Sequence, residues 1–389
     1  MNEFNNWYEY IKSRHEINLS LSFNRKDILF DYFQFIGGLK RQFINKLKSY
    51  KILRAMHKKF AGSSADLFFD WENFSDSAES FFETRELLDD MSKAQFDDVL
   101  LLRLCSFNSH YVSIVNFKPT LQLIERSFFK HELLASYYFF SHLEVFKYRC
   151  PDDSVVFVIG PSSLDTTLNN FHHYFPRRDF VSFLPKKGDI VFDCGACIGD
   201  MSIVYSALVG VDGGVHCFDP SPLHGEYIKA QIELNPDLTD TLVFKEAMVS
   251  DVTISNDAVA SISALEVRPG VHGLENCSSI TLDDYFLESS LERVDLIKMD
   301  IEGSEFSALD GASKIIREFR PKLAVSVYHK SDDMITLRRK IQELNPDYKF
   351  VFDHHTPLNG NQFFMPIRRL NYDRGIKFNF PPKLTFGYF

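Results

Sequence analysis

The sequence has no excess of basic residues, no long apolar run and no regular cysteine spacing. Its 43 lysines and arginines stand against 53 aspartates and glutamates, whereas a nucleic-acid-binding protein normally carries a basic excess. No run of about eighteen apolar residues occurs, so we expect no membrane-spanning helix. Residues 1–16 are polar and aromatic, which is not typical of a signal peptide. These absences favour a cytoplasmic globular protein that does not bind nucleic acid.

The six cysteines lack the spacing of a disulfide framework. Cys194 and Cys197 form a CxxC pair, but no second CxxC or nearby HxxxH completes a zinc site. A redox pair would lie inside a glycine-containing loop rather than at a free helix start. We therefore interpret both residues as small, reduced loop residues, as expected in the cytoplasm.

The GxGxxG fingerprint of dinucleotide-binding enzymes is also missing. Residues 189–202 (DIVFDCGACIGDMS) instead contain a short apolar strand, an acid at Asp193, and glycines at Gly195 and Gly199. Because glycine has no Cβ, the backbone of such a loop can approach a small ligand closely. The carboxylate of Asp193 suits a cationic or amine-bearing ligand better than a pyrophosphate.

The chain divides near Pro185 into two regions of different pattern. In the first region, residues 39–60 are expected to form an amphipathic helix with a basic face. Such a helix can lie on an anionic membrane surface, so peripheral membrane contact is one interpretation. The interpretation we favour is a helical hairpin with the acid-rich segment 66–98. Residues 154–159 are expected to form a strand that leads into the second region.

After Pro185, apolar segments alternate with helical ones, which predicts an α/β fold with a doubly wound sheet of seven strands. We expect strands at residues 190–193, 215–218, 242–246, 296–300, 323–328, 348–353 and 363–367. We expect helices at residues 201–208, 224–234, 305–319 and 333–344. Residues 251–276 are irregular and resemble an insertion. Such sheets bind ligands at the carboxyl ends of their strands.

Asp219 ends the second of these strands, twenty residues after Gly199. An acid at this distance accepts hydrogen bonds from ribose hydroxyls in many nucleotide-binding folds. The alternative is an N-cap for the following helix. The glycine loop and this acid together are more specific than either one alone.

Three acids lie at or just after the end of the strand at 296–300. Asp300 is its last residue, and Glu302 and Glu305 come within the next turn. Clustered carboxylates act as a base, position an acceptor or cap a helix. We predict site roles for Asp300 and Glu302, and a structural role for Glu305.

Histidines follow the next two strands. His329 comes just after the strand at 323–328, and its near-neutral pKa would let it act as a base for a hydroxyl. His354 and His355 are further candidates at the same sheet edge. Spacing alone leaves open whether these histidines and the carboxylates gather a metal, and we assign no metal ligand.

Five segments together resemble the FkbM-type methyltransferases: DIVFDCGACIGD, FDPSP, LDDYF, VDLIKMDIEGSEFSALDGA and SVYHKSDD. The resemblance covers about residues 183–370, and KMDIEGSE is its most specific part. It implies a Rossmann-like sheet, S-adenosyl-L-methionine as cofactor, and methylation of a hydroxyl oxygen. At the position of Cys197 the family usually has an asparagine, a change that keeps both glycines.

The resemblance also assigns roles to individual residues. It implies that the methionine portion of the cofactor is held by Asp193, Gly195 and Gly199, the ribose by Asp219, and the adenine border by Glu246 and Ala247. Asp300 and Glu302 match the acidic motif beside the transferable methyl group. With His329, they are our candidates for the catalytic residues.

We therefore expect an S-adenosylmethionine-dependent O-methyltransferase whose acceptor is a sugar or a bacterial surface glycan. A secondary-metabolite hydroxyl is the alternative acceptor. A different nucleotide-using enzyme, such as a dehydrogenase, and a non-catalytic interaction protein are the alternatives from other classes. The expected organisation is a mostly helical region at 1–150, a strand-containing connection at 151–182, the methyltransferase domain at 183–370 and a tail at 371–389.

Overall fold

The computed structural model describes residues 2–21, 71–105, 143–150, 152–161, 183–254, 277–354 and 362–364. Several predictions lie outside these residues: the basic helix at 39–60, most of the insertion at 251–276, His355 and the tail at 371–389.

Seven strands form one central sheet, which is mainly parallel. In spatial order they are β10 (Phe352–His354), β11 (Gln362–Phe364), β9 (Lys322–Ser326), β8 (Leu296–Met299), β3 (Ile190–Cys194), β4 (Gly214–Phe218) and β5 (Leu242–Lys245). Only β11 runs antiparallel to its neighbours within this sheet. The predicted α/β class with a mainly parallel sheet is therefore confirmed.

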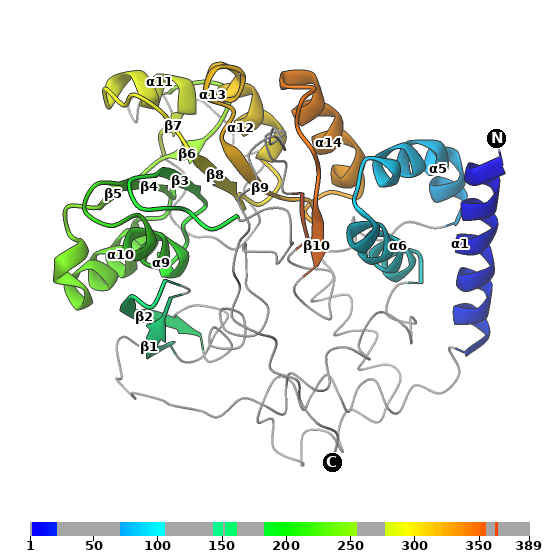
Figure 1. The fold of residues 1–389 in the computed structure, drawn as a ribbon, viewed down its shortest axis with the longest axis horizontal. Helices are drawn as coiled ribbons and strands as arrows, with labels where there is room; N and C mark the ends of the chain where they lie inside the picture. The colour runs from blue at the N-terminus through cyan, green and yellow to red at the C-terminus, as the bar shows by residue number, and fades with distance from the viewer. Residues whose placement is uncertain are drawn as a thin grey trace, which may run out of the picture.

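Helices cover both faces of the sheet, because successive strand residues point to opposite sides (Figure 1). In β3, Phe192 packs into one buried cluster and Val191 into the other. The first cluster receives α11 (Leu282–Glu288), α12 (Glu305–Gly311), α13 (Ser313–Phe319) and α14 (Asp333–Leu344). The second receives α9 (Asp200–Val209) and α10 (Pro222–Leu234).

Several elements differ from the ranges expected. The strand expected at 348–353 is reduced to β10 at Phe352–His354. The helix expected at 305–319 is divided into α12 and α13, and the division lies at Ala312. There Gly311 packs so closely on the carbonyl of Ser250 that an added Cβ would lie 2.0 Å from the oxygen. Helix α11 was not predicted; it begins where the Thr281 side chain accepts a hydrogen bond from the amide of Asp284.

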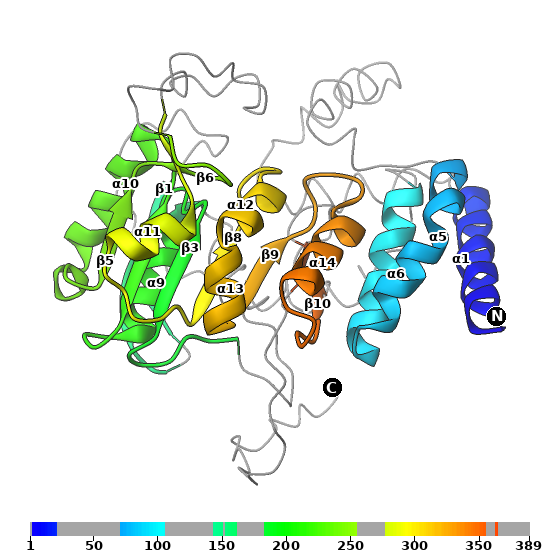
Figure 2. The same ribbon diagram turned by 90° about the horizontal axis from the view of Figure 1, so that it is seen from above.

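The N-terminal helices α1 (Asn2–Leu21), α5 (Trp71–Glu86) and α6 (Asp90–Cys105) extend the molecule beyond β10 and α14 (Figures 1 and 2). They share the first buried cluster with the sheet. The hydroxyl of Ser92 accepts from the amide of Phe352, and Gln95 donates to Asp353 at 2.9 Å. Helix α6 therefore joins the edge strand β10 through both polar and apolar contacts.

A small antiparallel hairpin, β1 (Leu143–Arg149) and β2 (Val155–Pro161), lies beside α9 and α10. The predicted boundary at residue 150 falls in its turn. Gln231 of α10 accepts from the amide of Ile159 and donates to its carbonyl, and Asn235 makes the same pair of bonds with Phe157. Two side-chain amides thus act as a substitute strand edge for β2.

Two short strands, β6 (Met248–Val249) and β7 (Ser279–Ile280), and the 3-10 helix η3 (Pro236–Leu238) complete the described elements. None of the described helices has the length and apolar character needed to cross a bilayer.

Candidate active site

The predicted site residues converge because four parallel strands end at one edge of the sheet. β3 pairs with β4 and β8, and β8 pairs with β9, so that Cys194 lies level with Phe218 and Met299. The loops that follow these strands carry Gly195, Asp219, Asp300 and His329. This edge is the ligand-binding edge in doubly wound sheets.

Asp193 is fully buried and is paired with Lys298 of the neighbouring strand. Its Oδ1 lies 3.0 Å from Lys298 Nζ, and its Oδ2 accepts from the Ser202 hydroxyl at 2.6 Å. Lys298 also donates to the carbonyl of Gly195 at 2.7 Å. Asp193 therefore organises the glycine loop through Lys298, and its carboxylate presents no exposed surface to a ligand.

Lys298 keeps its charge despite the burial. Burial opposes the ammonium form of Lys298, but Asp193 and Asp300 outweigh this effect and raise its pKa. A charged lysine inside an apolar strand is costly unless it is paired in this way.

The two glycines of the loop are required by the protein's own packing. Both have left-handed backbone conformations, with φ of +78°. A Cβ on Gly195 would lie 1.9 Å from the carbonyl oxygen of Asp300, and one on Gly199 would lie 2.9 Å from the Ile228 side chain. Protein atoms thus fill the space that a Cβ would occupy at each glycine, and the role of the loop in holding a ligand stays a prediction.

Asp219 fastens the loop to the end of β4. One carboxylate oxygen accepts from the amide of Cys197 at 2.9 Å; the other accepts from the amide of Ser221 at 2.9 Å and lies 2.5 Å from His224 Nδ1. Burial raises the pKa of Asp219 to about 7 and lowers that of His224 to about 4. The N-cap of α10 is Ser221, not Asp219.

The CxxC residues take no part in a disulfide. Cys194 is buried in β3, and Cys197 lies in the loop with its Sγ 4.0 Å from His224 Nε2. Burial raises the pKa of both thiols, so they stay protonated at neutral pH.

Glu246 and Ala247 follow β5 at the same edge as Asp219. The amide of Asp219 donates to the carbonyl of Lys245, which brings the two strand ends together. The Glu246 side chain is exposed, whereas Ala247 is buried.

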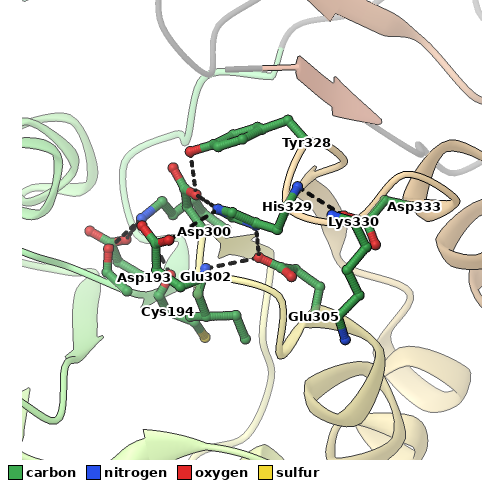
Figure 3. A network of polar contacts seen from close by, with 12 residues as sticks. Asp193, Cys194, Asp300, Glu302, Glu305, Tyr328, His329, Lys330 and Asp333 are labelled. Atoms are coloured by element: carbon green, nitrogen blue, oxygen red, sulfur yellow. Dashed lines mark hydrogen bonds and ion pairs between the residues drawn. The ribbon is translucent and has the colours of Figure 1, made fainter. Parts of the chain in front are cut away.

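Beyond β8, five side chains form a connected polar group (Figure 3). The Tyr328 hydroxyl donates to Asp300 Oδ1 at 2.7 Å. His329 Nε2 lies 3.4 Å from the same oxygen, and His329 Nδ1 lies 2.8 Å from Glu305 Oε1. The Glu302 carboxylate, which is mostly exposed, lies 3.8 Å from His329 Nε2.

His329 is charged in this environment, contrary to the expected near-neutral base. Burial alone would lower its pKa, but Glu305, then Asp300 and Glu302, raise it to about 9. A protonated imidazole has no lone pair to take a proton from a hydroxyl. His329 therefore acts as a cationic partner of the carboxylates.

Asp300, Glu305 and His329 each offer one potential metal ligand, and these atoms lie within 4.8 Å of one another. The assignment of no metal ligand thus stays a prediction. His354 ends β10 at the edge strand, and the structure describes its backbone only.

Sequence reasoning missed three members of this site. Lys298 was visible as a single charge in the otherwise apolar strand LIKM, and Tyr328 as an aromatic residue with a hydroxyl two residues after β9. Glu305 was taken as structural; its Oε1 does accept from the amide of Ile301, but it also contacts His329. No sequence pattern identifies Glu305 as a site residue, because its contact with His329 forms only when the chain folds.

The sheet and the loops at its edge define an α/β protein of the methyltransferase-like fold. Residues 193–352 match the family model of the methyltransferase FkbM domain. This match bears out the resemblance for residues 193–352, which are similar to FkbM methyltransferase domains. No curated protein is significantly similar to the chain in sequence.

Among solved structures, the chain is similar to the methyltransferase FkbM from Methylobacillus flagellatus KT, with 20% identity and a TM-score of 0.49. That alignment covers 76% of this chain and 60% of the other. It is also similar to an O-methyltransferase from Bacillus cereus solved with SAH, with 14% identity, coverage of 46% and 74%, and a TM-score of 0.32. Fibrillarin from Aeropyrum pernix, solved with S-adenosyl-L-methionine, gives 11% identity, coverage of 63% and 100%, and a TM-score of 0.33.

Proposed function

We propose that this protein transfers a methyl group from S-adenosylmethionine to a hydroxyl of a sugar or a bacterial surface glycan. The observation that carries the proposal is the position of Asp300, which is the partly exposed carboxylate between the glycine loop and His329. Its side chain is 16% exposed, while Asp193 and Glu305 are buried. Among these three carboxylates, Asp300 is therefore the one most open to an acceptor.

The residues fit a cofactor that carries positive charge. Asp193, Asp200 and Asp300 surround Lys298 closely enough to raise its pKa, which leaves more carboxylates than cations at this point. When bound, S-adenosylmethionine supplies an electrophilic methyl on a sulfonium, which such a surplus favours. We propose that the loop from Gly195 to Gly199 holds its methionine portion, Asp219 its ribose, and Glu246 with Ala247 its adenine.

The acceptor hydroxyl has to be oriented and its proton taken. In this proposal Asp300 accepts that hydrogen bond, while Tyr328 and His329 fix the carboxylate from the side. Glu302 stands at the exposed margin, where it would contact polar groups of the acceptor. Holding both reactants in near-attack geometry supplies most of the acceleration, and a base adds roughly 10²–10⁴-fold.

The polar side chains at the exposed edge near His329 favour a glycan acceptor over a large apolar one. The groups near His329 at the sheet edge are carboxylates and a phenol, which suit a ligand rich in hydroxyls. The flat apolar lining of a site for an aromatic metabolite is not formed by these side chains.

The test is incubation of the protein with methyl-labelled S-adenosylmethionine and either a cell-envelope glycan extract or a secondary-metabolite extract. Mass spectrometry should find the label as a methyl ether on a glycan fragment. The Asp300→Asn variant is the negative control. If the label is found on a secondary metabolite instead, the acceptor is a metabolite hydroxyl and not a glycan. Absence of transfer to either extract, with S-adenosylhomocysteine still bound, would favour a non-catalytic role.

A further inference from the structure

Arg103, in the last turn of α6, is one of the largest fully buried side chains of the molecule. Its Nη2 donates to the carbonyl of Val327 at 2.7 Å, and its Nη1 to the carbonyl of Ser331 at 3.3 Å. These two carbonyls enclose the segment 328–330. One guanidinium from the N-terminal region therefore holds both ends of the loop that carries Tyr328 and His329.

The same segment is held by a carboxylate through its amides. Asp333 is 3% exposed, and its Oδ2 accepts from the amides of His329 at 3.0 Å and Lys330 at 2.7 Å. Arg103 and Asp333 attract each other in the buried layer beneath the loop. Arg103 thus donates to the two carbonyls that enclose the segment, and Asp333 accepts from two of its amides. Together they fix the backbone of the loop.

A purely space-filling role does not explain Arg103. Burying a guanidinium is unfavourable, and an apolar side chain of similar volume would pack a core without that cost. What such a side chain could not do is donate to the carbonyls of Val327 and Ser331. The charge of Arg103, which it keeps because burial lowers its pKa only to about 10, is needed for the loop rather than for the core.

The position of this loop matters because its side chains contact Asp300. His329 Nε2 and the Tyr328 hydroxyl both approach Asp300 Oδ1, so a shift of the loop backbone changes both distances (Figure 3). A misplacement of about 1 Å at a reacting group can cost on the order of 10²-fold in rate.

We propose that Arg103 is a positioning residue for methyl transfer, which sets His329 and Tyr328 against Asp300 from a helix outside residues 193–352. The N-terminal helices are thereby part of the working enzyme. The inference rests on the proposed role of Asp300, but the placement of His329 can be measured without any acceptor.

The experiment compares Arg103→Met and Arg103→Lys with Arg338→Met in the full-length protein. Arg338 is a matched control: it is also buried, and its side-chain bonds go to Thr84 of α5 and to Gln342 of α14. The readout is the NMR titration of the His329 imidazole, assigned with a His329→Gln variant. Arg103→Met should shift the midpoint of His329 by about half a pH unit or more, Arg103→Lys by less, and Arg338→Met should leave it unchanged.

Turnover with labelled S-adenosylmethionine is measured on the same variants. Arg103→Met should reduce kcat on the order of 10²-fold with little change in S-adenosylhomocysteine affinity, and Arg103→Lys should recover part of the loss. An unchanged His329 titration in a folded Arg103 variant would overturn the proposal, as would an equal shift in Arg338→Met. If Arg103→Met does not fold, Arg103→Lys decides by the same titration. A shifted titration in a protein that transfers no methyl group would instead refute the proposed function and leave the positioning role standing.

Discussion

The two sides of the sheet edge hold their carboxylates in different ways. On the glycine-loop side, Asp193 is neutralised by Lys298, and Asp219 is held by two backbone amides and a neutral His224. On the other side, Asp300, Glu302 and Glu305 surround a single imidazole. On the first side, one carboxylate is paired with a buried lysine and the other is held mainly by backbone amides. The second carries surplus negative charge on side chains, which suits handling of a proton.

If the two sides of the sheet edge differ in this way, Asp300→Asn should have the largest effect of the substitutions. This effect should be on turnover and not on cofactor-analogue affinity. We expect kcat to fall roughly 10²–10⁴-fold, because the base is lost, with the affinity for S-adenosylhomocysteine within about threefold of wild type. Labelled methyl transfer and calorimetry measure the two quantities. Asp310→Asn is the control, since Asp310 of α12 pairs with Lys340 of α14. Equal losses in turnover and affinity would break the division between the two sides.

Next in size is the effect of Lys298→Met on stability. Removing the ammonium leaves Asp193 buried without its partner, which should lower the free energy of unfolding by about 3–5 kcal/mol. Urea denaturation measures it. The double variant Lys298→Met, Asp193→Leu should recover most of the loss, because two apolar side chains leave no buried charge. A double variant as unstable as the single one would show that the lysine acts mainly through the Gly195 carbonyl.

Asp219→Asn should weaken cofactor-analogue binding by about 10- to 150-fold, the range for hydrogen bonds to a charged group. The wild-type affinity for S-adenosylhomocysteine should also depend on pH. Because the pKa of Asp219 is about 7, its carboxylate becomes protonated as the pH falls through 7, and binding should weaken there. Calorimetry should be done over about one pH unit on either side of this pKa. The affinity should depend on pH in the wild type and not in Asp219→Asn. A flat wild-type profile would remove Asp219 from the ribose site.

The smallest effect is expected for Cys197→Ala. Its thiol lies 4.0 Å from His224 and stays protonated, so loss of Sγ should change analogue affinity by less than about threefold. Sensitivity to oxidants should also be unaltered. A large loss would mean that the CxxC pair has a chemical role after all.

Much of this architecture was accessible from sequence because it depends on local patterns. Apolar runs of strand length gave the sheet, and the acids at 219 and 300 mark the ends of β4 and β8. Packing across the chain was not accessible. Gly195 accommodates the Asp300 carbonyl 105 residues later, and Glu305 reaches His329 only after β9 has paired with β8.

The charge state of His329 was mispredicted for the same reason. An isolated imidazole titrates near neutrality, and only the three surrounding carboxylates make it a cation. Arg103 could not be assigned at all from sequence, because its partners lie more than 220 residues away, at Val327 and Ser331.

The contact between Gly195 and the backbone of Asp300 has a consequence for engineering this protein. An added Cβ at Gly195 would lie 1.9 Å from the Asp300 oxygen, so the two loops interlock at a point where neither can yield. Exchanging the segment around Asp300 for that of a relative, in order to change the acceptor, would therefore also displace the loop around Gly195. The two segments have to be transplanted as one unit.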